Sequence, residues 1–146
     1  MMKRISLMAL LVTVLCSMAC ARGKQPVAFT KLPQAIQDSV LVHFTADQVQ
    51  LATCEKTMPK HFEYELRIAD GTKLEYNQNA QLMEVKNKAG IKTAFVPEKV
   101  LTYITETFPN SIITEYKVSP MKKAVELNDD IELVFDKHGK FLRIDD

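Results

Sequence analysis

The same helical pattern occurs twice in the sequence, and this duplication most constrains how the chain can fold. Residues 96–110 read VPEKVLTYITETFPN, and residues 32–46 read LPQAIQDSVLVHFTA. A proline opens each segment, and apolar residues follow at intervals of four, which is typical of a short amphipathic helix. Because the apolar positions of the two segments keep a constant spacing, the chain is interpreted as two copies of one unit.

After each helical segment the apolar period changes from four to two. Phe62, Tyr64 and Leu66 alternate with Glu63 and Glu65, as expected of half-buried antiparallel strands. Asp70-Gly71 indicates a tight turn, and residues 77–80 and 136–139 indicate the last turn of each copy. The predicted strands are residues 49–54, 62–68, 73–76 and 82–86 in the first copy, and 113–118, 122–127, 131–135 and 141–144 in the second.

These elements predict an α+β fold of two repeats, each a helix plus a four-stranded antiparallel sheet, with both helices on one face. The predicted organisation is a leader at 1–21, a first repeat with an N-terminal tether at 22–86, a linker at 87–95 and a second repeat at 96–146. A unit of about 60 residues buries little surface alone, so the two copies are expected to share a sheet or to pack together. The sequence leaves one continuous sheet and two packed sheets equally open.

The first residues predict export. Lys3 and Arg4 precede an apolar run over residues 5–15, and small residues follow, which is the pattern of a signal peptide. Cleavage after Ala19 and cleavage after Ala21 both fit. Cys20 stands in a weak lipoprotein box, so a lipid-anchored structural or assembly protein is an alternative, and membrane association is expected only if Cys20 is lipidated.

Charge and cysteine content narrow the function further. Removing Lys3 and Arg4 from the 19 basic residues leaves 17 against 18 acidic ones. A nearly neutral chain has no basic field to displace the counterions of a nucleic acid, so no nucleic-acid partner is expected. If Cys16 and Cys20 leave with the leader, Cys54 stays alone, and it is interpreted as a small buried hydrophobe that resists alkylation.

No pattern of residues predicts a metal, a cofactor or a catalytic centre. The three histidines fall on different predicted elements, a helix, a strand start and a turn, and none has a second ligand at useful spacing. The pairs at 129–130 and 145–146 fit a solvated turn and a terminus better than a calcium loop. Ser39, Ser111 and Ser119 lack the glycine-flanked elbow of a serine hydrolase.

The succession of LPQAIQDSVLVHF or VPEKVLTYITETFPNSI, a Tyr-Glu-Leu type strand, and ADGTKLEYNQNAQLMEV or LNDDIELVFDKHGKFLRIDD resembles the PepSY-like secreted proteins. That family is described as similar in fold to beta-lactamase inhibitory protein, and the resemblance covers residues 28–146. It implies a small periplasmic protein with a suspected inhibitor role. The family brings no catalytic residue set, so the resemblance supports the fold more than the function.

The remaining candidate site is the sheet face away from the helices. Leu82 and Phe141 occupy equivalent positions of the two copies and are predicted to be its apolar anchors. The face predicts an exported, non-enzymatic module that binds an unknown protein or peptide of the cell envelope. An inhibitor-like role is one form that this binding can take. The alternative is a small envelope hydrolase that uses Glu63, Glu65, Glu126 and Glu132, which requires burial to raise the pKa of at least one of them. The candidate binding residues are Leu51, Glu63, Glu65, Arg67, Leu82, Glu126, Glu132, Val134, Phe141 and Arg143.

Overall fold

The strands hydrogen-bond in the order of the sequence into one antiparallel sheet. The structure is a computed structural model, and it describes residues 23–128 and 130–145. Within this part of the chain the strands are β1 (Gln25–Pro26), β2 (Val49–Met58), β3 (His61–Ile68), β4 (Lys73–Asn77), β5 (Leu82–Lys86), β6 (Ile113–Val118), β7 (Lys122–Leu127), β8 (Ile131–Asp136) and β9 (Phe141–Asp145). All eight strands predicted from alternation form, some longer than expected, and β1 is an addition.

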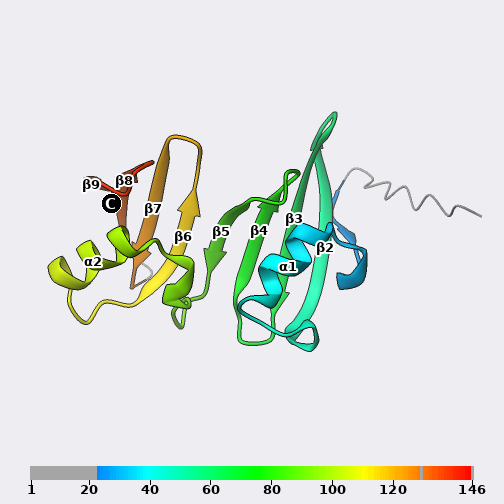
Figure 1. Ribbon diagram of the computed structural model, residues 1–146, viewed down its shortest axis with the longest axis horizontal. Coiled ribbons are helices and arrows are strands. Elements are labelled where there is room, and N and C mark those ends of the chain that lie inside the picture. Colours follow the sequence, from blue (N-terminus) through cyan, green and yellow to red (C-terminus); the bar gives the residue numbers. More distant parts are fainter. Residues whose placement is uncertain (1–22, 129, 146) are drawn as a thin grey trace, which may run out of the picture.

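Two short helices lie on the same side of this sheet (Figure 1). The helix α1 (Gln34–Leu41) follows Pro33, and α2 (Glu98–Thr107) follows Pro97. Proline suits this place because the first turn of a helix needs no N–H from it. Single turns of 3-10 helix complete the described part at η1 (Phe29–Lys31), η2 (Ala46–Gln48) and η3 (Thr93–Phe95).

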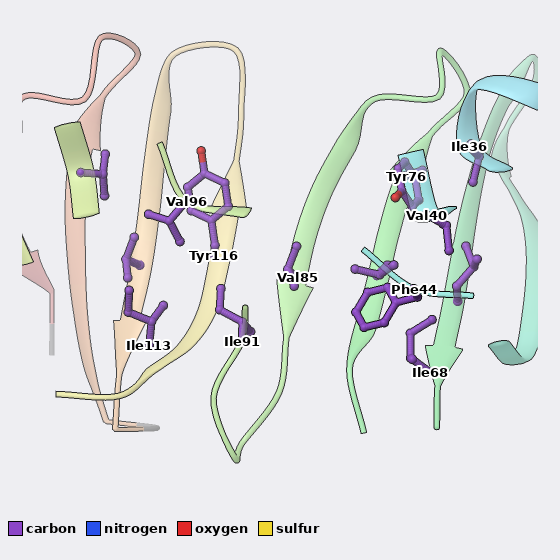
Figure 2. Close-up of a cluster of buried hydrophobic side chains, with 14 of the residues drawn as sticks. Ile36, Val40, Phe44, Ile68, Tyr76, Val85, Ile91, Val96, Ile113 and Tyr116 are labelled. Atoms are coloured by element: carbon purple, nitrogen blue, oxygen red, sulfur yellow. The ribbon is translucent and has the colours of Figure 1, made fainter. Parts of the chain in front are cut away.

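Each helix turns its buried residues onto the sheet. Ile36 and Val40 of α1, with Phe44 just beyond it, lie in one hydrophobic cluster with Ile68 and Tyr76 (Figure 2). The same cluster continues without interruption to Val100 and Ile104 of α2 and to the strands beneath them. The buried hydroxyl of Tyr76 lies 3.0 Å from Ser39 Oγ, so the polar end of this core residue has a partner.

The predicted α+β fold of two helix-plus-four-strand repeats was wrong. The protein is mostly β, because its helices contain only 8 and 10 residues and its strands join into a single nine-stranded sheet in the described chain. The joint is between β5 and β6, where Val85 pairs with Tyr116 in antiparallel register. Edge strands satisfy their backbone groups by such pairing, which apolar periodicity does not reveal.

Residues 87–95, predicted as a linker, pack closely against both halves of the sheet. The Asn87 amide donates hydrogen bonds to the Asp70 carbonyl at 3.2 Å and to Thr72 Oγ1 at 3.1 Å. The Phe95 ring stacks on Phe44 with centroids 6.1 Å apart. The centroid of the His43 ring lies 4.0 Å from that of Phe95. The segment therefore connects the end of α1 to the start of α2 through side-chain packing.

Among the described residues, neither helix has the length and apolar character needed to cross a bilayer. The leader predicted at 1–21 and the lipidation candidate Cys20 lie outside the described residues.

A single sheet with a single core predicts cooperative unfolding. Val85→Ala removes two methyl groups from a fully buried side chain at the β5–β6 joint, and we expect a loss of about 2 kcal/mol that lowers one shared melting temperature. Far-ultraviolet circular dichroism and tyrosine fluorescence should report coincident transitions in both proteins. Two separate transitions in the unaltered protein would contradict this expectation.

In the turn between β4 and β5, Ala80 has a strained backbone conformation that a substitution can relieve. Asn77 Oδ1 accepts hydrogen bonds from the amides of Asn79 and Gln81, each at 3.0 Å, and Ala80 adopts a positive φ of 60°. The turn between β8 and β9 repeats this geometry around Asp136, with Gly139 in the equivalent place at φ 81°. A side chain with a Cβ is disfavoured at such φ values, whereas glycine is not.

We therefore expect Ala80→Gly to stabilise the protein by about 1 kcal/mol, measured by urea denaturation. The reverse change, Gly139→Ala, should destabilise it by a similar amount. Destabilisation by Ala80→Gly would show that the strain is absent.

Candidate functional site

The sheet face turned away from α1 and α2, here called the open face, carries two parallel rows of mostly charged side chains. Residues in a row are direct cross-strand partners, so each row runs across the sheet from β2 to β9. The first row is Leu51, Arg67, Lys73, Lys86, Glu115, Glu126, Glu132 and Asp145. The second row is Thr53, Glu65, Glu75, Glu84, Lys117, Ala124, Val134 and Arg143.

Ion pairs link the two rows along the sheet. Lys73 Nζ lies 2.9 Å from a Glu75 oxygen and 3.1 Å from a Glu84 oxygen. Lys117 Nζ lies 2.7 Å from Glu115 Oε1, and Arg143 Nε lies 2.7 Å from Asp145 Oδ1. Except at Glu115, these groups lie near solvent, so each of their pairs adds little stability alone, and the combined effect is to hold the side chains in place.

Glu115 is the centre of this network. Its side chain is only 3% exposed, and Lys86 Nζ lies 2.8 Å from its second oxygen. Burial raises the pKa of this carboxyl, but hydrogen bonds from Lys117 and Lys86 outweigh burial, so the pKa is lowered overall. The carboxylate is therefore held ionised beneath two ammonium groups.

At the β2–β4 end of the open face there is a hollow of about 300 Å³, here called the acidic hollow. Two pairs of glutamates stand directly opposite one another in it, Glu55 with Glu63 and Glu65 with Glu75. Like charges in such positions repel, so the hollow concentrates unfavourable electrostatic energy. Its lining residues are Lys24, Thr53, Glu55, Glu63, Tyr64, Glu65, Glu75, Tyr76, Asn77 and Met83.

The cations near the acidic hollow neutralise only part of it. Lys24 bonds to Glu65 Oε2, and Arg67 Nε donates to Glu65 Oε1 at 3.1 Å. Within residues 23–128 and 130–145, Glu55 and Glu63 form no ion pair or side-chain hydrogen bond. These two carboxylates are available to a ligand.

The two residues predicted as apolar anchors do not lie on the open face. Leu82 pairs with Tyr76 and packs against the core, and Phe141 pairs with Phe135 and does the same. Its ring stacks on Tyr103 of α2 with centroids 4.7 Å apart. The cause in each strand is a register shift, between Glu75 and Tyr76 in one ladder and between Val134 and Phe135 in the other.

A register shift inserts one extra residue, which reverses the face to which the preceding side chain points. Met83 is the extra residue of β5, and it lines the acidic hollow where Leu82 was expected. Sequence reasoning missed Met83. No signal in the alternation of β5 marks the shift.

The other predicted site residues do lie on the open face but are not gathered in one place. Glu63 and Glu65 belong to the acidic hollow, and Leu51 and Arg67 flank it as direct partners. The remaining four lie in the second half of the sheet: Glu126, Glu132, Val134 and Arg143. Val134 is fully buried there, so it offers no surface to a ligand.

Glu65, one of the carboxylates proposed for a hydrolase, lacks the raised pKa that such chemistry needs. Burial raises the pKa of Glu65, but hydrogen bonds from Lys24 and Arg67 outweigh burial and lower the pKa overall. An acid catalyst requires the opposite shift. Burial does raise the pKa of Glu84, with Glu75 and Glu115 adding to the effect, but Glu84 is already bound to Lys73.

Cys54 is buried, as the sequence predicts, and it is disulfide-bonded. A bonded sulfur cannot act as a nucleophile, and the lone thiol expected once the leader has left stays a prediction. The other two cysteines, Cys16 and Cys20, lie outside the described residues. In the part of the chain that the structure describes, no group of three or more histidine, cysteine or acidic side chains is placed to hold a metal ion.

The sequence matches the family model described as "Putative beta-lactamase-inhibitor-like, PepSY-like" over residues 62–143, which is more than half of the chain. The chain belongs to this PepSY-like family. The match begins in β3 and ends in β9, so it leaves out β2 and the residues that β2 contributes to the open face. No curated protein matches the sequence.

Three solved structures of similar proteins have the same fold, each with a TM-score of 0.77. One is a putative calcium-regulated periplasmic protein from Bacteroides thetaiotaomicron, 26% identical, covering 84% of this chain and 97% of its own. Two are putative periplasmic proteins from Bacteroides vulgatus: one is 23% identical and covers 85% and 100% of the two chains, and the other is 24% identical and covers 86% and 99%. This PepSY-like chain thus resembles periplasmic proteins over nearly its whole described length.

The Glu115 network predicts an acid-dependent loss of stability. Because the folded-state pKa of Glu115 lies below its ordinary value of 4.5, its contribution is present above about pH 4.5 and is lost as pH falls through the folded-state pKa. We expect Glu115→Gln to cost roughly 1 to 2 kcal/mol at pH 7 and less at pH 3, measured by urea denaturation. An equal cost at both pH values would show that the charge of Glu115 is not the cause.

Proposed function

We propose that this protein is an exported, non-enzymatic binding module that holds a basic segment of another protein or peptide in the acidic hollow of its open face. The leader pattern and the likeness to periplasmic proteins support export. Membership of the family described as beta-lactamase-inhibitor-like supports a binding role. The position and the charge of the ligand are inferred from the open face alone.

The observation that carries the proposal is the uneven balance of charge across the open face. From β6 to β9 the acidic side chains lie beside lysine or arginine, as Glu115 does between Lys86 and Lys117. In the acidic hollow, Glu55 and Glu63 face each other, and no cation of the described residues pairs with either of them. A bound ammonium or guanidinium group would replace this repulsion with attraction, so the free protein is electrostatically prepared for a cation.

The lining of the hollow suits a long basic side chain better than a small ion. Met83 supplies apolar surface beside the carboxylates, and lysine and arginine bury their methylene stems on such surface while their charged ends bind acids. Met83 and Glu75 also line a second hollow of about 350 Å³ between β5 and β7. The two hollows therefore adjoin on the open face.

The experiment compares two short peptides, one of alternating lysine and serine and one of alternating glutamate and serine, by isothermal titration calorimetry. The lysine peptide should bind and the glutamate peptide should not. The double variant Glu55→Lys/Glu63→Lys should weaken binding at least about tenfold, because it places two cations in the hollow. Binding should also weaken with added salt.

The matched control is Glu98→Lys/Glu106→Lys, which makes the same change of charge on exposed positions of α2. It should bind the lysine peptide as the unaltered protein does. Equal binding of both peptides, or equal loss in the two double variants, would show that net charge acts rather than the acidic hollow, and the site would be rejected.

A further inference from the structure

The two edges of the sheet are not protected equally. At one edge, β1 has only two residues, and one of them is Pro26. The Val27 amide donates to the Ala52 carbonyl at 2.8 Å, so the alternation of the backbone turns the Pro26 nitrogen outward, where it has no hydrogen to donate. A short edge strand that contains proline resists pairing with another chain.

The strand at the other edge, β9, is longer than β1 and contains no proline, although its ladder with β8 includes a register shift. Its five residues, FLRID, include no proline, glycine or lysine. Leu142 is 50% exposed and Ile144 is 48% exposed, although both belong to a strand of the sheet. Exposed apolar side chains on an unpaired edge strand are typical of a strand that accepts a partner strand.

We propose that β9 pairs with β9 of a second copy of this chain, antiparallel and about a two-fold axis, so that two sheets become one. The two-fold axis is perpendicular to the sheet, because only that orientation brings two identical edges together as antiparallel neighbours. It also leaves the helices of both copies on the same side. The proposal is independent of the ligand proposed for the acidic hollow.

Sheet geometry permits few registers for this contact. Directly opposite residues of neighbouring strands point to the same face. One residue of β9 must therefore stand opposite the same residue of the second copy, with the axis midway between the two. In β9, Arg143 and Asp145 point to the open face, as their partners Val134 and Glu132 do, and Ile144 points to the helix side with Leu133. The register is therefore centred on Arg143, Ile144 or Asp145.

The charges of β9 select one of these three. A centre at Arg143 places two guanidinium groups opposite each other, and a centre at Asp145 places two carboxylates opposite each other. A centre at Ile144 places Arg143 opposite the second copy's Asp145 twice, once on each side of the axis. It also places Ile144 against Ile144 of the second copy, which buries the apolar side chain that the single chain exposes.

The Arg143–Asp145 ion pair within one strand, at 2.7 and 3.0 Å, supports this arrangement. Both side chains already lie over the open face, so a second copy completes a ring of four alternating charges without moving them far. The contact spans few residues and buries little area, so the dimer is expected to be weak and to form with increasing protein concentration.

The test uses protein that is expressed with its leader and purified from the cell envelope after any processing by the cell. Sedimentation velocity of the unaltered protein, up to about 0.1 mM, should show a monomer that converts to a dimer. Arg143→Asp alone places aspartate opposite Asp145, and Asp145→Arg alone places arginine opposite Arg143. Each single variant should remain a monomer at the same concentrations.

Mixing the two single variants in equal amounts should restore dimers, because the acidic β9 of one is complementary to the basic β9 of the other. Circular dichroism and melting curves of each variant establish that both are folded before mixing. A monomer at all concentrations for the unaltered protein, dimers of either single variant alone, or no dimer in the mixture would each overturn the proposal.

Discussion

The pairing of β5 with β6 is the contact on which the rest of the structure depends. Only three residue pairs form it: Glu84 with Lys117, Val85 with Tyr116, and Lys86 with Glu115. The middle pair points into the core, and the outer two pairs point to the open face with opposite charges opposed. Loss of this joint would expose two sheet edges and divide the hydrophobic cluster that underlies both helices.

The charge pattern of the open face follows from this joint. In β3, β4 and β5, the first row is basic and the second row is acidic, whereas from β6 onward the first row is acidic and Lys117 and Arg143 make the second row basic. The inversion falls between β5 and β6. Without it, lysine would meet lysine and glutamate would meet glutamate at the joint, so the two halves would repel where they must hydrogen-bond.

Alternation predicted the strands well because it reports which side of a strand is buried, and burial is a local property of the sequence. The face of Leu82 and of Phe141 was not predictable in this way, since one extra residue in the ladder reverses it and nothing nearby records the insertion. For the same reason Met83 was missed. The joint between β5 and β6 is non-local, and charge alone does not reveal it, because lysine faces lysine and glutamate faces glutamate between β4 and β5.

The two proposed contacts lie at opposite ends of the sheet, the acidic hollow on β2 to β4 and the dimer contact on β9 (Figure 1). A two-fold axis perpendicular to the sheet preserves its faces, so both hollows of a dimer would open on the same side. They would be separated by the full width of two sheets, because β9 is central in the dimer and β2 is near its outer edges. Such a dimer favours a ligand with two distant basic segments, since binding of the first raises the effective concentration of the second.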